Sequence, residues 1–264
     1  MYPSQMIRLL STDFDGTLVD HFAKPPVVPG LFELLRDLQS HGAVWAVNTG
    51  RTLSHIVEGL QEFGFPIQPD FVLTTEREVF RRKAGGGWED FGDWNRRCFD
   101  AHEELFAVAQ PLLEEIVAYV ESETAARIIF EGSRPIGLVG TSDEEMARIL
   151  AFIDRARGRL SAFSYQQNTV YLRFCHSDYS KGAALGELGR LTGISRGEIC
   201  AVGDHYNDIP MLDGRYARWT GCPSNAAEAV KEIVRKSGGH VAGGACSQGV
   251  VEIIERFRNG AFPQ

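Results

Sequence analysis

The stretch MIRLLSTDFDGT, residues 6–17, joins an apolar run to two aspartates and a glycine. The run Met6 to Thr12 predicts a β-strand, and Gly16 favours a turn directly after it. The side chains of Asp13 and Asp15 can converge on one site where the chain turns off the strand. Because adjacent carboxylates disfavour each other's ionisation, the pair indicates a shared proton or a bound Mg²⁺.

Two further apolar runs, Ala43 to Asn48 and Phe71 to Thr74, alternate with helical patterns. The helical pattern between the first two strands carries leucines that we expect to face the core, namely Leu31, Leu34, Leu35 and Leu38. This alternation predicts an α/β fold with a parallel sheet. Ligands bind at the carboxyl ends of the strands in such sheets, so polar residues that follow a strand are candidates for a site.

The second predicted strand runs into Asn48-Thr49-Gly50-Arg51. Thr49 offers a hydroxyl, Gly50 a backbone amide open to close approach, and Arg51 a guanidinium, which together suit a phosphate group. The same residues are also typical of an ordinary helix N-terminus, so this stretch is a weak signal by itself.

The last third of the chain supplies two more polar groups. Lys181 begins a predicted helix, where its ammonium and the first helix amides can face an anion. The predicted strand Ile199 to Val202 runs into the polar segment Gly203 to Asp208. Asp204 and Asp208 lie close together if this segment turns helically, and a divalent cation is the simplest partner for such a pair.

Residues 79–178 differ from the flanking segments in the order of their predicted helices and strands. A predicted helix is followed by two short strands, and the same order then repeats, which predicts an antiparallel sheet covered by two helices. We therefore expect residues 1–78 and 179–264 to form one domain, with residues 79–178 as an inserted α+β domain. The four strands expected in the insert are Arg127 to Glu131, Ile136 to Gly140, Leu160 to Tyr165 and Thr169 to Phe174.

The composition limits the possible partners. The formal net charge of −8 over 264 residues argues against nucleic acid, and no apolar run approaches the roughly 18 residues needed to span a bilayer. The first residues resemble neither a signal peptide nor a transit peptide, so we expect a cytoplasmic protein without a membrane partner. The five cysteines form no CxxC pair and are expected to be reduced, buried thiols. The composition carries no signal for an oligomeric state.

Taken in order, four groups of residues resemble the motifs of the haloacid dehalogenase superfamily of phosphatases. They are Asp13-x-Asp15-Gly-Thr, Thr49-Gly-Arg51, Lys181 and Gly203-Asp204-x-x-Asn207-Asp208. The insert is similar to the cap of the Cof-type subclass, and short segments near Trp88 and Gly243 are similar to sucrose-phosphate phosphatases. The resemblance implies a Rossmann-like parallel-sheet core with an inserted α+β cap domain.

The resemblance also implies a role for each matched residue. Asp13 would attack phosphorus to form an aspartyl-phosphate, assisted by Lys181, and would bind Mg²⁺. Asp15 would act as acid and base and complete the metal shell through its main-chain carbonyl, and Asp204 would ligate the metal. Asp208 would orient groups around that shell. The implied substrate-binding residues are Phe14, Thr49, Gly50, Arg51, Lys181 and Asn207.

The resemblance implies a Mg²⁺-dependent phosphatase acting on a small phosphate ester, such as a sugar phosphate. A sugar phosphomutase using the same intermediate is an alternative, although the cap shows only scattered arginines, such as Arg134 and Arg173, to hold a second phosphate. A non-catalytic phosphate-binding module is a third interpretation, against which the presence of the nucleophile and the lysine argues. Arg134, Trp88 and Trp94 are candidate cap contacts to the leaving group, but a turn charge or core packing is the favoured role for each.

Overall fold

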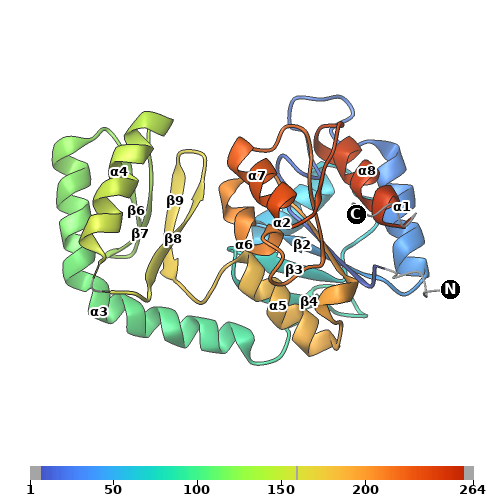
Figure 1. Ribbon diagram of the computed structural model, residues 1–264. Helices are drawn as coiled ribbons and strands as arrows, with labels where there is room; N and C mark the ends of the chain where they lie inside the picture. Colours follow the sequence, from blue (N-terminus) through green and yellow to red (C-terminus); the bar gives the residue numbers. More distant parts are fainter. Residues whose placement is uncertain (1–6, 159, 259–264) are drawn as a thin grey trace. The chain divides into compact units, whose positions relative to one another are not determined.

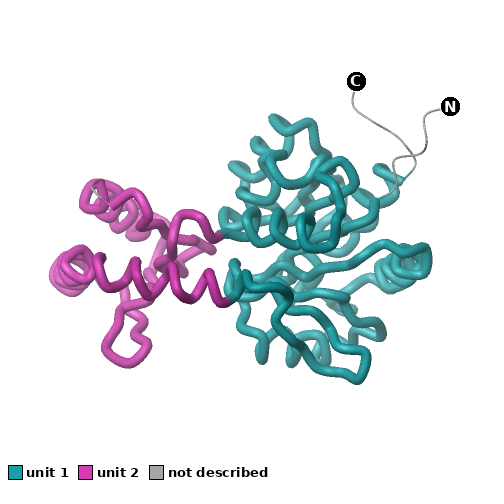
Figure 2. The backbone as a smooth tube through the Cα atoms, turned by 90° about the horizontal axis from the view of Figure 1, so that it is seen from below, with its two compact units in different colours: residues 1–95, 180–264 teal, residues 96–179 magenta. Residues whose placement is uncertain are grey.

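The computed structural model describes residues 7–158 and 160–258 (Figure 1). Met6, where the first strand was expected to begin, lies outside these residues. The chain forms two compact units (Figure 2). One comprises the described residues up to Asn95 together with those from Ser180 onward, and the other comprises Arg96–Tyr179. None of the described helices is long and apolar enough to cross a membrane.

An eight-stranded sheet forms the centre of the first unit. Its strands are β1 (Leu9–Thr12), β2 (Val44–Asn48), β3 (Phe71–Thr74), β4 (Glu78–Arg82), β5 (Trp88–Asp90), β10 (Ile199–Val202), β11 (Trp219–Cys222) and β12 (His240–Val241). They lie in the order β12-β11-β10-β1-β2-β3-β4-β5, and the strands from β12 to β3 are parallel. The predicted α/β fold with a Rossmann-like parallel sheet is confirmed. β1 and β10 are buried along their whole length, as expected where helices cover both faces.

Residues 79–95 belong to the first unit, not to the inserted domain expected from residue 79 onward. β4 pairs antiparallel with β3 and β5 pairs antiparallel with β4, so the chain extends the sheet before it leaves. Trp88 packs against the core of this unit, and Trp94 is buried and donates its indole N–H to the carbonyl of Arg77 at 2.5 Å. These two tryptophans are therefore packing residues of the first unit. The observed junctions follow Asn95 and Tyr179.

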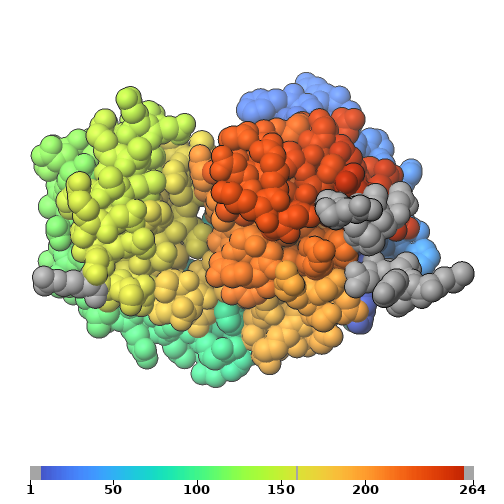
Figure 3. Space-filling view, viewed as in Figure 1, coloured from blue at the N-terminus to red at the C-terminus, as the bar shows by residue number. Residues whose placement is uncertain are grey.

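Helices cover this sheet on both sides (Figure 1). The predicted leucine stripe is buried in α1, and one hydrophobic core joins α1 and α8 to β1 and β2. The glycine-rich stretch from residue 238 to 249 contains β12 and the start of α8. In Figure 3, atoms of α7 and α8 form the orange-red to red part of the surface that faces the viewer. The helices of this unit are α1 (Pro29–Ser40), α2 (Leu53–Glu62), α5 (Lys181–Thr192), α6 (Ile209–Leu212), α7 (Glu228–Lys236) and α8 (Cys246–Arg258), with short 3₁₀ turns at Arg196–Glu198 and Tyr206–Asp208.

The second unit is a four-stranded antiparallel sheet with two helices, as the repeated helix-strand-strand pattern predicts. Helix α3 (Trp94–Glu123) begins in the first unit and continues into the second, where α4 (Asp143–Ala156) is the other helix. Buried side chains of both helices and of the sheet form a separate hydrophobic core. The strands are β6 (Arg127–Glu131), β7 (Arg134–Val139), β8 (Phe163–Asn168) and β9 (Tyr171–His176), in the order β6-β7-β9-β8.

We expect Gly182→Ala to destabilise the first unit, because an added Cβ would lie 2.1 Å from the carbonyl oxygen of Pro210. Overpacking against backbone costs about 1–3 kcal/mol in the free energy of unfolding. Gly30 is the matched control, since it also occupies the second position of a helix but has no atom within 4 Å of an added Cβ. Urea unfolding should show a change of about 0.5 kcal/mol or less for Gly30→Ala. Equal losses for the two variants would contradict this account.

Candidate active site

The loops that follow the central parallel strands meet at one edge of the sheet. Asp13 follows β1, Thr49 follows β2 and Gly203 follows β10, and these strands are neighbours. Backbone hydrogen bonds extend the ladder into the loops. The amide of Asp13 donates to the carbonyl of Val202 at 2.9 Å, and that of Thr49 donates to Leu73 at 2.8 Å. The sequence-predicted groups therefore lie together, as the carboxyl ends of parallel strands should.

Lys181 lies at the centre of this group. Its Nζ donates to Asp13 Oδ1 and to Asp208 Oδ1, both at 2.6 Å. The lysine is only 1% exposed. Although burial alone would lower the pKa of Lys181, the charges of Asp13 and Asp208 outweigh it and raise that pKa, so the ammonium stays charged.

Asp208 holds the loop after β10 in shape. Its Oδ2 accepts the backbone N–H groups of Asp204 and His205 at 2.8 and 2.9 Å. Asp204 Oδ1 accepts the hydroxyl of Thr17 at 2.6 Å. Because both oxygens of Asp208 are already engaged, Asp13 and Asp204 are the carboxylates best placed to receive a ligand.

Gly16 brings the loop after β1 close to Asp204. Its backbone is left-handed, with φ 78°, and an added Cβ would lie 2.5 Å from Asp204 Oδ2. Only glycine combines this conformation with so close an approach.

Carboxylate oxygens of Asp13, Asp204 and Asp208 lie within 4.8 Å of one another. Burial raises the pKa of Asp13 well above its ordinary value despite the lowering effect of Lys181. Burial, followed by the charge of Asp208, raises the pKa of Asp204 to about 7. Three buried carboxylates facing one ammonium leave negative charge uncompensated, and a hard divalent cation with oxygen ligands fits this site.

Asp15 has a different environment from Asp13. Its carboxylate accepts two hydrogen bonds from Arg51, at 2.7 Å from Nε and 2.6 Å from Nη2, and lies 2.7 Å from His21 Nε2. Burial opposes ionisation here, but the hydrogen bonds and charge of Arg51 outweigh it and lower the pKa of Asp15. The surroundings therefore shift the pKa values of the two motif aspartates in opposite directions, upward for Asp13 and downward for Asp15.

The expected substrate-binding residues fall into two groups. Thr49 and Asn207 are buried, and Gly50 and Arg51 follow Thr49 on the loop after β2. Phe14 is the exception, because its side chain is fully buried in the core, 6.0 and 5.7 Å from the rings of Phe63 and Phe65. The phenyl ring packs in the core beneath the motif, so substrate binding by Phe14 stays a prediction that its side chain does not support.

Two residues near the site were not found from the sequence. His21 contacts Asp15 from an exposed loop, and Glu76 is buried in the turn between β3 and β4. His21 belongs to no periodic pattern. Glu76 follows a strand of the sheet, so the rule used for the other strand ends would have found it.

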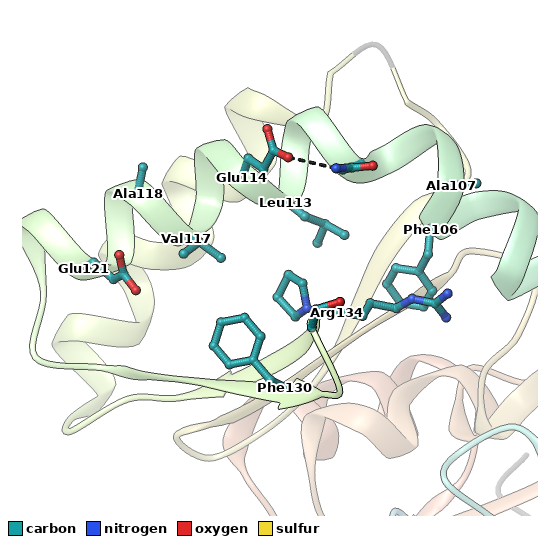
Figure 4. A pocket seen from close by; sticks show the side chains of 12 residues that line it. Phe106, Ala107, Leu113, Glu114, Val117, Ala118, Glu121, Phe130 and Arg134 are labelled. Atoms are coloured by element: carbon teal, nitrogen blue, oxygen red, sulfur yellow. Dashed lines mark hydrogen bonds between the residues drawn. The ribbon is translucent and has the colours of Figure 1, made fainter.

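The second unit contains a cavity of about 490 Å³ between α3 and the β6–β7 hairpin (Figure 4). Arg134 lines it and lies over the ring of Phe106 at 5.3 Å, with its guanidinium paired to Glu103. That pairing supports the turn-charge role favoured for Arg134. Apolar and acidic side chains line the remainder, among them Leu113, Val117, Phe130, Glu114 and Glu121.

Comparisons with known proteins agree with this fold and site. The family model of haloacid dehalogenase-like hydrolases matches residues 117–254. "Putative phosphatase YxeH" of Bacillus subtilis (strain 168) is 34% identical over 257 residues, covering 87% of this chain and 90% of that protein. A phosphoglycolate phosphatase of Methanoculleus marisnigri is 26% identical over 222 residues, covering 79% and 81%. The structure of the sucrose-phosphatase from Synechocystis sp. PCC6803 superposes with a TM-score of 0.72 at 17% identity, covering 98% and 100%.

The match to the family model and to the curated relative shows that this chain is a hydrolase. The chain belongs to the haloacid dehalogenase-like hydrolase family. The resemblance seen in the four motifs is confirmed, and so is the enzyme class, a phosphatase of the haloacid dehalogenase type.

We expect the protein without a divalent cation to lose stability as the pH rises from about 4 to about 7. The pKa of Asp204 is raised from 3.8 to about 7 in the folded chain, so the folded state binds this proton more tightly than the unfolded state. The free energy of unfolding is therefore higher below this window and lower above it. Mg²⁺ should replace the proton, and its stabilising effect should grow with pH.

Melting temperatures measured with Mg²⁺ or with a chelator, at about pH 5 and about pH 8, test this expectation. The gain from Mg²⁺ should be larger at the higher pH, and Asp204→Asn should remove the difference. A gain that is equal at both pH values would contradict the assignment.

Proposed function

We propose that this protein is a Mg²⁺-dependent phosphatase that hydrolyses a small phosphorylated metabolite, a sugar phosphate or a similar polyol phosphate, through an aspartyl-phosphate on Asp13. The observation that carries the proposal is the buried Asp13–Lys181 pair, 2.6 Å long, beside an acidic cluster at the strand ends. Names of relatives support it, since they include two phosphatases and a sucrose-phosphatase whose structure holds sucrose and phosphate.

Asp13 is the proposed nucleophile. One of its oxygens forms a bond to phosphorus while the bond from phosphorus to the ester oxygen breaks. Lys181 holds Asp13 Oδ1 in place and can neutralise a transferring phosphoryl oxygen. Asp13 and Asp204 would hold Mg²⁺, which haloacid dehalogenase-type phosphatases generally use and which supplies positive charge to the phosphoryl group when bound. Ionisation of Asp13, which burial disfavours, would accompany binding of the cation.

Asp15 is the proposed acid and base. It gives a proton to the departing alkoxide and later takes one from the water that cleaves the aspartyl-phosphate, so each turnover restores its proton. Arg51 holds this carboxylate ionised in the structure, which suits the base step. For the acid step Asp15 must gain a proton, so we propose that Arg51 moves from Asp15 toward the substrate when the phosphate ester binds. Main-chain ligation of the cation by Asp15 stays a prediction.

The remaining roles concern binding. Thr49 and the Gly50 amide would bind phosphoryl oxygens, and Asn207 would complete the site. We propose that the second unit is the cap that recognises the leaving group, because an inserted domain can exclude bulk water during the reaction. The cytoplasmic location expected from the sequence stays a prediction.

Asp13→Asn should abolish Mg²⁺-dependent phosphate release from p-nitrophenyl phosphate and from a panel of phosphorylated metabolites. Asparagine keeps the size of the side chain but is a poor nucleophile, so kcat should fall by at least about 10³-fold. The preferred metabolite of the unchanged protein would identify the substrate. An isomerised sugar phosphate in place of free phosphate would indicate a phosphomutase, and inertness of the unchanged protein with tight phosphate binding would indicate a binding module.

Asp15→Asn should separate the two half-reactions. p-Nitrophenolate leaves without protonation, so Asp13 should still be phosphorylated, whereas the later attack by water lacks its base. Intact-protein mass spectrometry should therefore show the aspartyl-phosphate accumulating in Asp15→Asn but not in the double variant with Asp13→Asn. Normal turnover of a sugar phosphate by Asp15→Asn would contradict the assigned role.

A further inference from the structure

Glu76 is a buried carboxylate with no role in the mechanism above. It is 5% exposed and lies in the turn that joins β3 to β4. Thr75 and Glu76 both have left-handed backbone, with φ of 49° and 68°. Residues other than glycine rarely adopt this conformation, and two in succession persist only where surrounding contacts hold them.

This turn is bonded to the loop after β2, which carries the proposed phosphate-binding groups. The amide of Thr75 donates to the carbonyl of Arg51 at 2.9 Å, and the amide of Glu76 donates to the carbonyl of Thr49 at 3.1 Å. The hydroxyls of Thr74 and Thr75 donate to Glu78 at 3.0 and 2.8 Å. None of these four hydrogen bonds uses the carboxylate of Glu76, so they hold the turn in place without that carboxylate.

The carboxylate of Glu76 is directed instead to the loop after β10. Its Oε1 accepts a hydrogen bond from Asn207 Nδ2 at 2.7 Å. It also lies close to the loop after β2, because a Cβ added to Gly50 would be 3.2 Å from the same oxygen. Glu76 thus contacts both neighbouring segments of the active site.

An ionised carboxylate can only accept hydrogen bonds, whereas an amide side chain has a donor end and an acceptor end. The pairing therefore requires the NH₂ group of Asn207 to face Glu76 and its Oδ1 to face away. Oδ1 is buried and accepts no hydrogen bond from the described residues. Asn207 lies three positions after Asp204, on the same loop as this proposed cation ligand.

We propose that Glu76 is a positioning residue that fixes the orientation of the Asn207 amide, so that the carbonyl oxygen of Asn207, and not its NH₂ group, is presented to the cation. This inference rests on the proposed function, because it assumes a cation held by Asp13 and Asp204. Residues that orient groups around a metal typically change metal affinity by about 10–100-fold when they are removed. Without Glu76 the amide can turn over and present hydrogens, which a cation repels.

The test is calorimetric titration of Mg²⁺ into the whole protein without substrate. Glu76→Ala should weaken Mg²⁺ binding by about 10-fold. Glu76→Gly should weaken it equally while keeping or raising the melting temperature, since glycine accepts the left-handed backbone. Glu78→Ala is the matched control, because it removes a carboxylate at the start of β4 that accepts the hydroxyls of Thr74 and Thr75, and its Mg²⁺ affinity should stay within about 2-fold of the original.

A double-mutant cycle separates orientation from simple loss of charge. If Glu76 acts through Asn207, adding Glu76→Ala to Asn207→Ala should cause no further loss of Mg²⁺ affinity. Equal losses in both backgrounds would overturn the positioning role, and so would unchanged affinity in Glu76→Gly. Failure of the unchanged protein to bind Mg²⁺ would contradict the proposed function itself, and the inference with it.

Discussion

The bridge from Lys181 to Asp13 and Asp208 is the interaction on which the rest of the structure depends. An ammonium that is 1% exposed has lost nearly all its water, and it stays charged because two carboxylates lie 2.6 Å away. The three residues come from the end of β1, the start of α5 and the turn after β10. β1 lies beside β10, and this strand order brings the three charged groups together. The charge balance of the site therefore depends on the order of the strands.

The positive charge of Lys181 does not balance the carboxylates around it. Asp13 and Asp204 are buried, and burial raises the pKa of both, which means that their charged forms are unfavourable in the folded chain. A protein selected for stability alone would replace them with neutral residues. Keeping them leaves an excess of negative charge at this edge of the sheet, which the proposed cation would neutralise.

Much of this arrangement follows from the sequence, and the rest does not for physical reasons. Buried parallel strands are mostly apolar, so the runs that form β1 and β10 can be recognised, and the charged residues directly after them indicate the site. β4 has the sequence Glu-Val-Phe-Arg-Arg, with charged residues that a position near the edge of the sheet allows. Because of these charges, it was not recognised as a strand from the sequence. Phe14 shares a motif with two aspartates but turns into the core, since neighbouring residues leave a strand end in different directions. The position of Glu76 after β3 could have been found by the same strand-end rule, but its contact with Asn207, far away in the sequence, is not visible in any local pattern.

The position of the insert has a consequence for how the chain is made. β1 lies between β2 and β10, yet the ribosome completes β2 to β5 and the whole second unit before β10 exists. During that interval one side of β1, which is buried along its length in the folded protein, is an open strand edge of the kind that pairs with other chains. The second unit has its own core and sheet and can fold during this delay. The nascent protein is therefore most prone to aggregation while its insert is being synthesised, and the arrival of β10 closes the exposed edge and completes the lysine bridge in one step.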